Sequence, residues 1–149
     1  IGQEVVIARP GLFGPYPDAI KEQVYRSLYY RRMAHSAEDI TQLVLEQLGA
    51  PPPEGHGDVH NGFILHYSRR PSAELALVEE QVKGLIAKDL TINPTGICQI
   101  TIGESTRRCT GPRLHLRSTG EIENFRLEKE YLRDPLTGTY SIVGRVGSG

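Results

Sequence analysis

Histidine and cysteine are the residue types in this sequence that are most suited to binding a metal ion. The five histidines and two cysteines are His35, His56, His60, His66, His115, Cys98 and Cys109. His56 and His60 have a His-x-x-x-His spacing, but they lie in a segment rich in glycine and proline and not on a helix that would hold both imidazoles to one ion. The sequence also lacks a His-Glu-x-x-His motif, a glycine-rich phosphate loop and a Gly-x-Ser-x-Gly motif. We therefore expect no metal, no cofactor and no catalytic residues.

The two cysteines permit a geometric test. A hairpin that turns at Gly103 and Glu104 places residues opposite each other when their numbers add to 207, as those of Cys98 and Cys109 do. The two cysteines would then form a hydrogen-bonded pair, whose wider Cα separation still falls within the range of a disulfide. A disulfide and two free thiols both remain open, and we favour free thiols.

Arginine and tyrosine gather in the segment YRSLYYRR, residues 25–32. Arginine binds phosphates and tyrosine stacks on bases, so this composition fits nucleic-acid binding as well as a protein interface. Nucleic-acid binders usually carry a basic excess, whereas the net charge here is -1. We therefore favour an interface with a protein. The candidate partner-binding residues are Arg26, Tyr30, Arg31, Arg32, Arg107 and Arg108.

Length and composition indicate one soluble domain, residues 1–149. A chain of 149 residues has a common size for a single domain, and 38% hydrophobic with 23% charged residues is ordinary for a soluble protein. No apolar run approaches the roughly 18 to 20 residues of a transmembrane helix. The first residue is Ile1 and the one methionine is Met33, so we expect a processed or trimmed N-terminus. The compartment stays open.

The first half of the chain predicts an extended arm and three helices. Residues 1–17 form the arm, and proline-rich GPYPD before residue 19 favours a helix start there. Ser36 followed by Asp39 resembles a capping box, so we expect a second helix that ends at Gly49. Prolines and glycines predict a loop over residues 50–61.

The third helix is predicted from Ser72, which we expect to be its N-cap. One apolar face follows it at helical spacing. The residues of that face are Leu75, Val78, Val82, Leu85 and Ile86.

The C-terminal third predicts a β-meander. Its strand-like segments, separated by turn residues, are ICQITIG, PRLHLRS, EIENFRLEKEYL and TYSIVGRV. Helices grouped early and antiparallel strands grouped late indicate an α+β fold, with three helices packed on a curved, mainly antiparallel sheet. This element order is similar to that of the NTF2-like and cystatin-like folds. The likeness concerns element order and implies no activity, because such folds carry many functions.

These features favour a non-catalytic protein-binding or assembly module, a subunit or accessory component of a larger complex. The expected partner is another protein or a second copy of the chain. The first alternative is a small-molecule-binding protein or enzyme that uses a pocket on the concave sheet face. Its candidate pocket residues are His66, His115, Glu128 and Tyr131. The second alternative is a nucleic-acid-binding protein that uses the surfaces rich in arginine and tyrosine.

Overall fold

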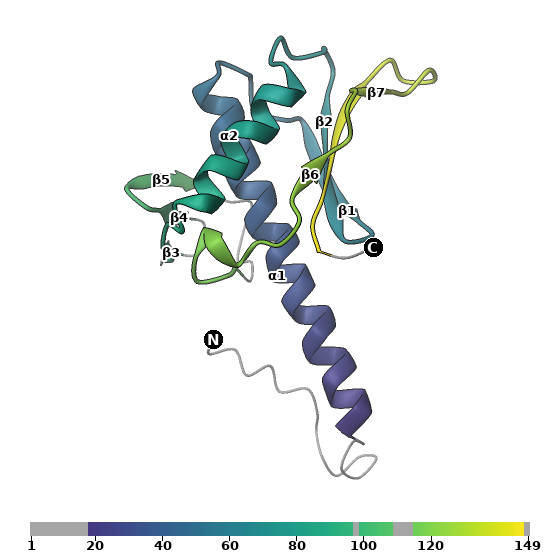
Figure 1. Ribbon diagram of the computed structural model, residues 1–149. Coiled ribbons are helices and arrows are strands. Elements are labelled where there is room, and N and C mark those ends of the chain that lie inside the picture. The colour runs from purple at the N-terminus through teal and green to yellow at the C-terminus, as the bar shows by residue number, and fades with distance from the viewer. Residues whose placement is uncertain (1–17, 97–98, 109–114, 148–149) are drawn as a thin grey trace.

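The computed structural model describes residues 18–96, 99–108 and 115–147, without the side chains of residues 18–28 and 108. These residues form two α-helices and two antiparallel sheets (Figure 1). The fold is α+β as predicted, but it has two helices instead of three, and the NTF2-like or cystatin-like order is not confirmed. The predicted arm and the two cysteines lie outside the described residues. No helix in the described ranges is long and apolar enough to cross a membrane.

A single helix, α1 (Asp18–Gln47), replaces the first two predicted helices. The predicted break at Ser36 is wrong, because the side chains that resemble a capping box bind residues far along the chain. Ser36 Oγ accepts a hydrogen bond of 2.9 Å from the Leu116 amide, and Asp39 contacts His115. The helical backbone therefore continues through this region.

Helix α1 ends at Gln47, next to the predicted end at Gly49. Gly49 has a φ of 87°, in the left-handed region that favours glycine. Its amide donates to the Glu46 carbonyl at 3.0 Å, and the Ala50 amide donates to the Leu45 carbonyl at 2.9 Å. This is a Schellman motif, which satisfies two carbonyls that the helix itself leaves unpaired.

The second helix, α2 (Leu75–Ala87), has the predicted core face but a different start. Leu75, Val78 and Val82 are buried, and the other two predicted residues pack partly buried against the same core. Ser72 is exposed and lies outside the helix, whose N-cap is Glu74 without a side-chain cap. The prediction that Ser72 caps this helix is therefore wrong.

The larger sheet has five strands in the order β1-β2-β8-β6, with β7 also paired to β8. Its strands are β1 (Gly55–Val59), β2 (Gly62–Tyr67), β6 (Arg126–Leu127), β7 (Leu132–Arg133) and β8 (Tyr140–Arg145). The predicted loop over residues 50–61 thus contains a strand. Glycine weakens a strand without preventing its pairing, and Asn61, with a φ of 51°, allows a tight turn into β2.

The smaller sheet has three strands, β3 (Ile92–Gly96), β4 (Gln99–Ile102) and β5 (Ser105–Arg108). Gln99 pairs with Arg108 and Ile102 with Ser105, which confirms the predicted register of the hairpin over its described residues. Gly103 in the turn has a φ of 62°. Residues 115–118 of the predicted next strand form only an isolated bridge, before the 3-10 helix η1 (Thr119–Glu121). The expected single curved sheet is therefore two separate sheets.

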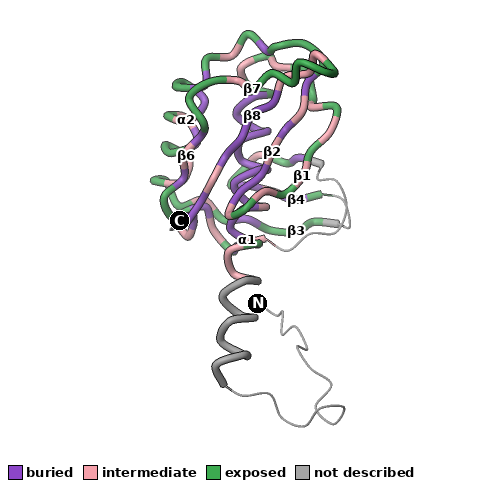
Figure 2. The backbone as a smooth tube through the Cα atoms, turned by 90° about the vertical axis from the view of Figure 1, so that its right-hand side faces the viewer, coloured by how far each residue is buried: buried purple, intermediate pink, exposed green. Residues whose placement is uncertain are grey.

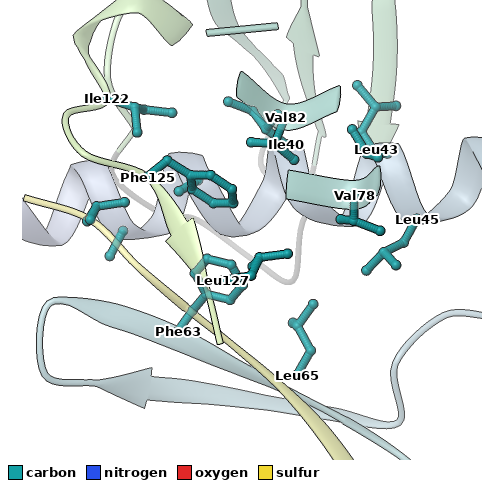
Figure 3. Packing of buried hydrophobic residues seen from close by; sticks show 14 of the residues in the cluster. Ile40, Leu43, Leu45, Phe63, Leu65, Val78, Val82, Ile122, Phe125 and Leu127 are labelled. Atoms are coloured by element: carbon teal, nitrogen blue, oxygen red, sulfur yellow. The ribbon is translucent and has the colours of Figure 1, made fainter. Parts of the chain in front are cut away.

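The two helices lie between the sheets (Figure 1). Most of β2 and β8 is buried, whereas β1 is exposed or intermediate along its length (Figure 2). The core joins α1, α2, β2 and the segment around β6 (Figure 3). Its residues include Ile40, Val44, Phe63, Leu65, Val78, Val82, Ile122, Phe125 and Leu127. Burial of these side chains fixes both helices against the inner face of the larger sheet.

Candidate functional site

The middle of α1 is buried on all sides. Every residue from 36 to 45 is buried, including five polar or charged residues. A helix that is enclosed in this way must supply partners for its polar side chains, because an unpaired buried charge costs several kcal/mol or shifts its protonation. We use the name α1 polar cluster for Glu38, Asp39, Gln42, Arg107 and His115.

Asp39 is the centre of the α1 polar cluster. Its Oδ2 lies 2.5 Å from Nε2 of His115, and its Oδ1 lies 3.6 Å from Nε of Arg107. The side chains of His115 and Arg107 are each 6% exposed, and that of Asp39 is 2% exposed. A carboxylate in such surroundings interacts strongly with both partners, because little water screens the charges.

Arg107 connects β5 to α1 through its guanidinium fork. Its Nη2 donates to Gln42 Oε1 at 2.9 Å, and its Nη1 donates to Glu46 Oε1 at 3.1 Å. The Gln42 amide then donates to Glu38 Oε2 at 3.0 Å. These contacts place a continuous set of polar groups along one side of the buried helix segment.

An aspartate that orients a histidine is also the arrangement of a general base. In this structure, however, the groups of the α1 polar cluster bind one another. The two nearby hydroxyls of α1 have other partners: Thr41 Oγ1 donates to the Ala37 carbonyl, and Ser36 Oγ accepts from the Leu116 amide. The observed chemistry is that of a polar contact between α1, β5 and residues 115–116.

Two further pairs link α1 to β1. His35 Nε2 lies 3.5 Å from Asp58 Oδ1, and His56 Nδ1 lies 3.5 Å from Glu38 Oε2. Each element thus supplies one histidine and one carboxylate. Among the described residues, no group of three or more His, Cys, Asp and Glu side chains is placed to hold a metal ion.

The four predicted pocket residues have different partners in the described structure. His66 Nδ1 lies 2.8 Å from Ser141 Oγ, between β2 and β8. The Tyr131 hydroxyl donates to the Ala73 carbonyl at 2.7 Å. His115 belongs to the α1 polar cluster, and Glu128 lines a groove at the sheet edge. Burial raises the pKa of Tyr131, which keeps its hydroxyl protonated as a donor.

The groove at the sheet edge has a volume of about 750 Å³. Its lining residues are Glu79, Arg126, Leu127, Glu128, Lys129, Glu130, Leu132 and Arg145. It forms where the chain between β6 and β7 leaves the edge of β8. Leu127 pairs with Gly144 and Leu132 with Ser141, so residues 128–131 face two residues of β8, and the Glu128 amide still donates to the Val143 carbonyl at 2.8 Å. Two leucines and charged residues of both signs therefore line the groove.

The predicted partner-binding arginines are spread over different surroundings. Arg107 is buried, and its guanidinium binds Gln42 and Glu46 within the chain. Arg31 is exposed, and Arg32 is half-buried. Tyr30 packs edge-to-face on Tyr29, with ring centroids 5.9 Å apart. The side chains of the remaining two, Arg26 and Arg108, lie outside the described residues.

The turn between β7 and β8 holds a feature that the sequence analysis missed. Leu136 is 95% exposed at this turn, and Leu132 on β7 is 50% exposed. The Leu136 amide donates to Asp134 Oδ1 at 2.9 Å, and the Gly138 amide donates to the Asp134 carbonyl at 2.7 Å. The hydrogen bond from the Leu136 amide lowers the pKa of Asp134. The turn lies between two of the predicted strand-like segments, but nothing in its sequence, DPLTG, indicated that the leucine would be exposed.

No protein-family model matches this chain, and no curated protein is similar to it.

Proposed function

We propose that this protein is a non-catalytic protein-binding or assembly module. Its contact surface is the β7–β8 hairpin surface, defined as Lys129, Glu130, Leu132 and Leu136. The observation that carries this proposal is the 95% exposure of Leu136 on a turn that hydrogen bonds fix in place.

A fixed apolar side chain suits protein recognition. Binding energy at interfaces concentrates in a few side chains that enter a pocket on the partner. Ordering a mobile loop on binding costs free energy, and a turn that is already ordered avoids that cost. Asp134 orders this turn through its side chain and its backbone, so Leu136 is presented in one position before a partner arrives.

The chemistry of the partner follows from the composition of this surface. The β7–β8 hairpin surface contains one acidic and one basic residue beside its two leucines, all of them exposed. Such a surface suits a protein with an apolar pocket and a mixed polar rim better than a polyanion. The burial of Arg107 also interrupts the arginine surface on which nucleic-acid binding would depend.

The α1 polar cluster supports a binding module over an enzyme. Its histidine, carboxylates and arginine bind one another. These contacts hold α1 to β5, which accounts for the buried polar residues without a catalytic role. Three of the residues predicted to line a pocket have partners within the chain: His66 contacts Ser141, His115 contacts Asp39, and the Tyr131 hydroxyl donates to the Ala73 carbonyl.

Site-specific photo-crosslinking tests the proposal. A photoreactive amino acid in place of Leu136 should capture a specific protein in cells that produce this chain, because position 136 would lie in the partner's pocket. The same residue in place of Leu132 should capture the same protein.

Glu80 gives the matched control, since it is exposed on α2 and lies outside the β7–β8 hairpin surface. A photoreactive residue there should give no such adduct. Adducts of equal yield at positions 80 and 136, or none at 132 and 136, would overturn the proposal.

A further inference from the structure

The outer edge of β1 is open in the described part of the chain. β1 ends the strand order of the larger sheet and pairs with β2 alone. Val59 pairs with Gly62 across a two-residue turn, so this pair is hydrogen-bonded and the bonding alternates along β1. Gly55 and Gly57 therefore direct their amides and carbonyls to β2. His56 and Asp58 direct theirs outward, where they can receive another strand.

The sequence of β1, Gly-His-Gly-Asp-Val, is complementary to itself in the antiparallel direction. If two copies of β1 pair about a two-fold axis at Gly57, then His56 of each copy faces Asp58 of the other. Opposite charges directly across an antiparallel pair are favourable, and like charges are unfavourable. A two-fold pair contains this favourable combination twice, as in any isologous interface.

The backbone hydrogen-bonding pattern of β1 is also consistent with a two-fold axis at Gly57. The outward groups of His56 and Asp58 would form two hydrogen-bonded pairs, which give four backbone hydrogen bonds between the copies. Gly57 would face its own copy in the intervening non-hydrogen-bonded pair, where Cα atoms approach to about 4.5 Å. Glycine inside a strand often marks the close approach of another backbone, and it offers no side chain to hinder this one.

The contacts between α1 and β1 would extend across the axis. Asp58 already contacts His35, and His56 already contacts Glu38. The side chains of Asp58 and His56 remain 62% and 29% exposed, so each has surface left for a partner. Pairing would join these contacts into one alternating row of histidines and carboxylates that spans both copies.

We propose that the protein forms a two-fold symmetric dimer through antiparallel pairing of β1 with β1 of a second copy. The two larger sheets become one continuous sheet, and the His56–Asp58 pairs select a second copy over other exposed strands. This dimer is independent of the β7–β8 hairpin surface. If both proposals hold, the dimer presents that surface twice and binds a multivalent partner with increased avidity.

Charge-exchange variants test the dimer in the full chain, with mass measured by analytical ultracentrifugation. The unmodified protein should be a dimer at micromolar concentrations. His56→Asp places two carboxylates opposite each other, and Asp58→His places two imidazoles opposite each other. Each variant should dimerise at least about tenfold more weakly, because two attractive pairs are lost.

An equimolar mixture of the two variants gives the decisive result. In a mixed dimer every carboxylate again faces an imidazole, so the mixture should recover the dimer that each variant has lost. His56→Asp also disturbs the contact with Glu38 inside one chain, and mixing cannot repair that damage. Recovery therefore reports pairing between chains.

Glu80→His is the matched control for Asp58→His, because it makes the same change of charge at an exposed position on α2. It should leave the dimer intact. A monomeric unmodified protein, single variants that dimerise normally, or a mixture that stays monomeric would each overturn the inference. None of these outcomes bears on crosslinking at position 136, so the two proposals fail separately.

Discussion

Asp39 Oδ2 lies 2.5 Å from Nε2 of His115, and this contact joins the middle of α1 to a residue 76 positions later in the chain. Arg107, on β5, approaches the other oxygen of the same carboxylate. One buried side chain thus ties together three segments that no local pattern connects. Because its partners are also buried, removal of Asp39 leaves their polar groups without a counterpart.

We expect Asp39→Ala to lower the free energy of unfolding by about 3–5 kcal/mol, the usual effect of breaking a buried ion pair from one side. Glu46→Ala is the control, because Glu46 also contacts Arg107 but is 50% exposed. It should cost less than about 1 kcal/mol. Urea unfolding of both variants measures the difference, and equal losses would show that Asp39 is not the centre of the cluster.

Val82 offers a test of the helix packing. It is fully buried on the face of α2 that meets the core, so Val82→Asp would enclose an unpaired charge. The expected loss is about 3 kcal/mol or more, with loss of cooperative melting. Lys83→Asp, at the neighbouring exposed position, should leave the melting cooperative. An unchanged thermal midpoint for Val82→Asp would mean that this face does not pack as described.

Replacing glycine by alanine should have opposite effects on stability at two positions. A Cβ at Gly144 would lie 2.3 Å from Cζ of Phe63, whereas a Cβ at Gly84 on α2 meets nothing within 4 Å. Gly144→Ala should destabilise the protein by about 1–3 kcal/mol, the cost of overpacking a core. Gly84→Ala should stabilise it by up to about 1 kcal/mol, the difference in helix propensity. The thermal midpoints of the two variants measure these effects. A shift of the same sign in both midpoints would contradict the packing of Phe63 against Gly144.

The elements with regular local patterns were predictable from the sequence. The β4–β5 register follows from one turn at Gly103, and the core face of α2 follows from apolar spacing. The break at Ser36 was predicted wrongly, because a serine and an aspartate three residues apart look the same whether they cap a helix or bind distant residues. The strand β1 was missed because its glycines give no strand propensity.

The α1 polar cluster could not be predicted, since its members come from separate parts of the chain. Glu38, Asp39 and Gln42 lie on the side of the helix opposite the apolar stripe around Ile40 and Val44, which is the ordinary pattern of a helix with one face in water. That pattern does not distinguish a surface helix from the enclosed helix that the structure shows. Identifying the partners of these polar residues requires the fold.

Asp134 gives a prediction about the β7–β8 hairpin surface. The hydrogen bond from the Leu136 amide favours the ionised carboxyl and lowers its pKa below the ordinary value of 3.8. Since the folded-state pKa is depressed, the stabilisation of the turn is fully present above the unfolded pKa and is lost as the pH falls through the folded pKa. NMR titration of Asp134 should therefore give a midpoint below 3.8. A midpoint at or above this value would contradict the turn geometry.

Asp134→Ala then tests whether a fixed turn matters for recognition. The substitution removes the acceptor of the Leu136 amide, so this amide should exchange with solvent faster while the core amides keep their protection. The thermal midpoint should hardly change, because the turn is exposed. Crosslinking from position 136 should fall, since the partner now has to order the turn on binding. Glu130→Ala, which leaves the turn hydrogen bonds intact, should preserve slow exchange at Leu136. If Asp134→Ala accelerates exchange and leaves the crosslinking yield unchanged, then exposure of Leu136 and not its fixed position governs binding.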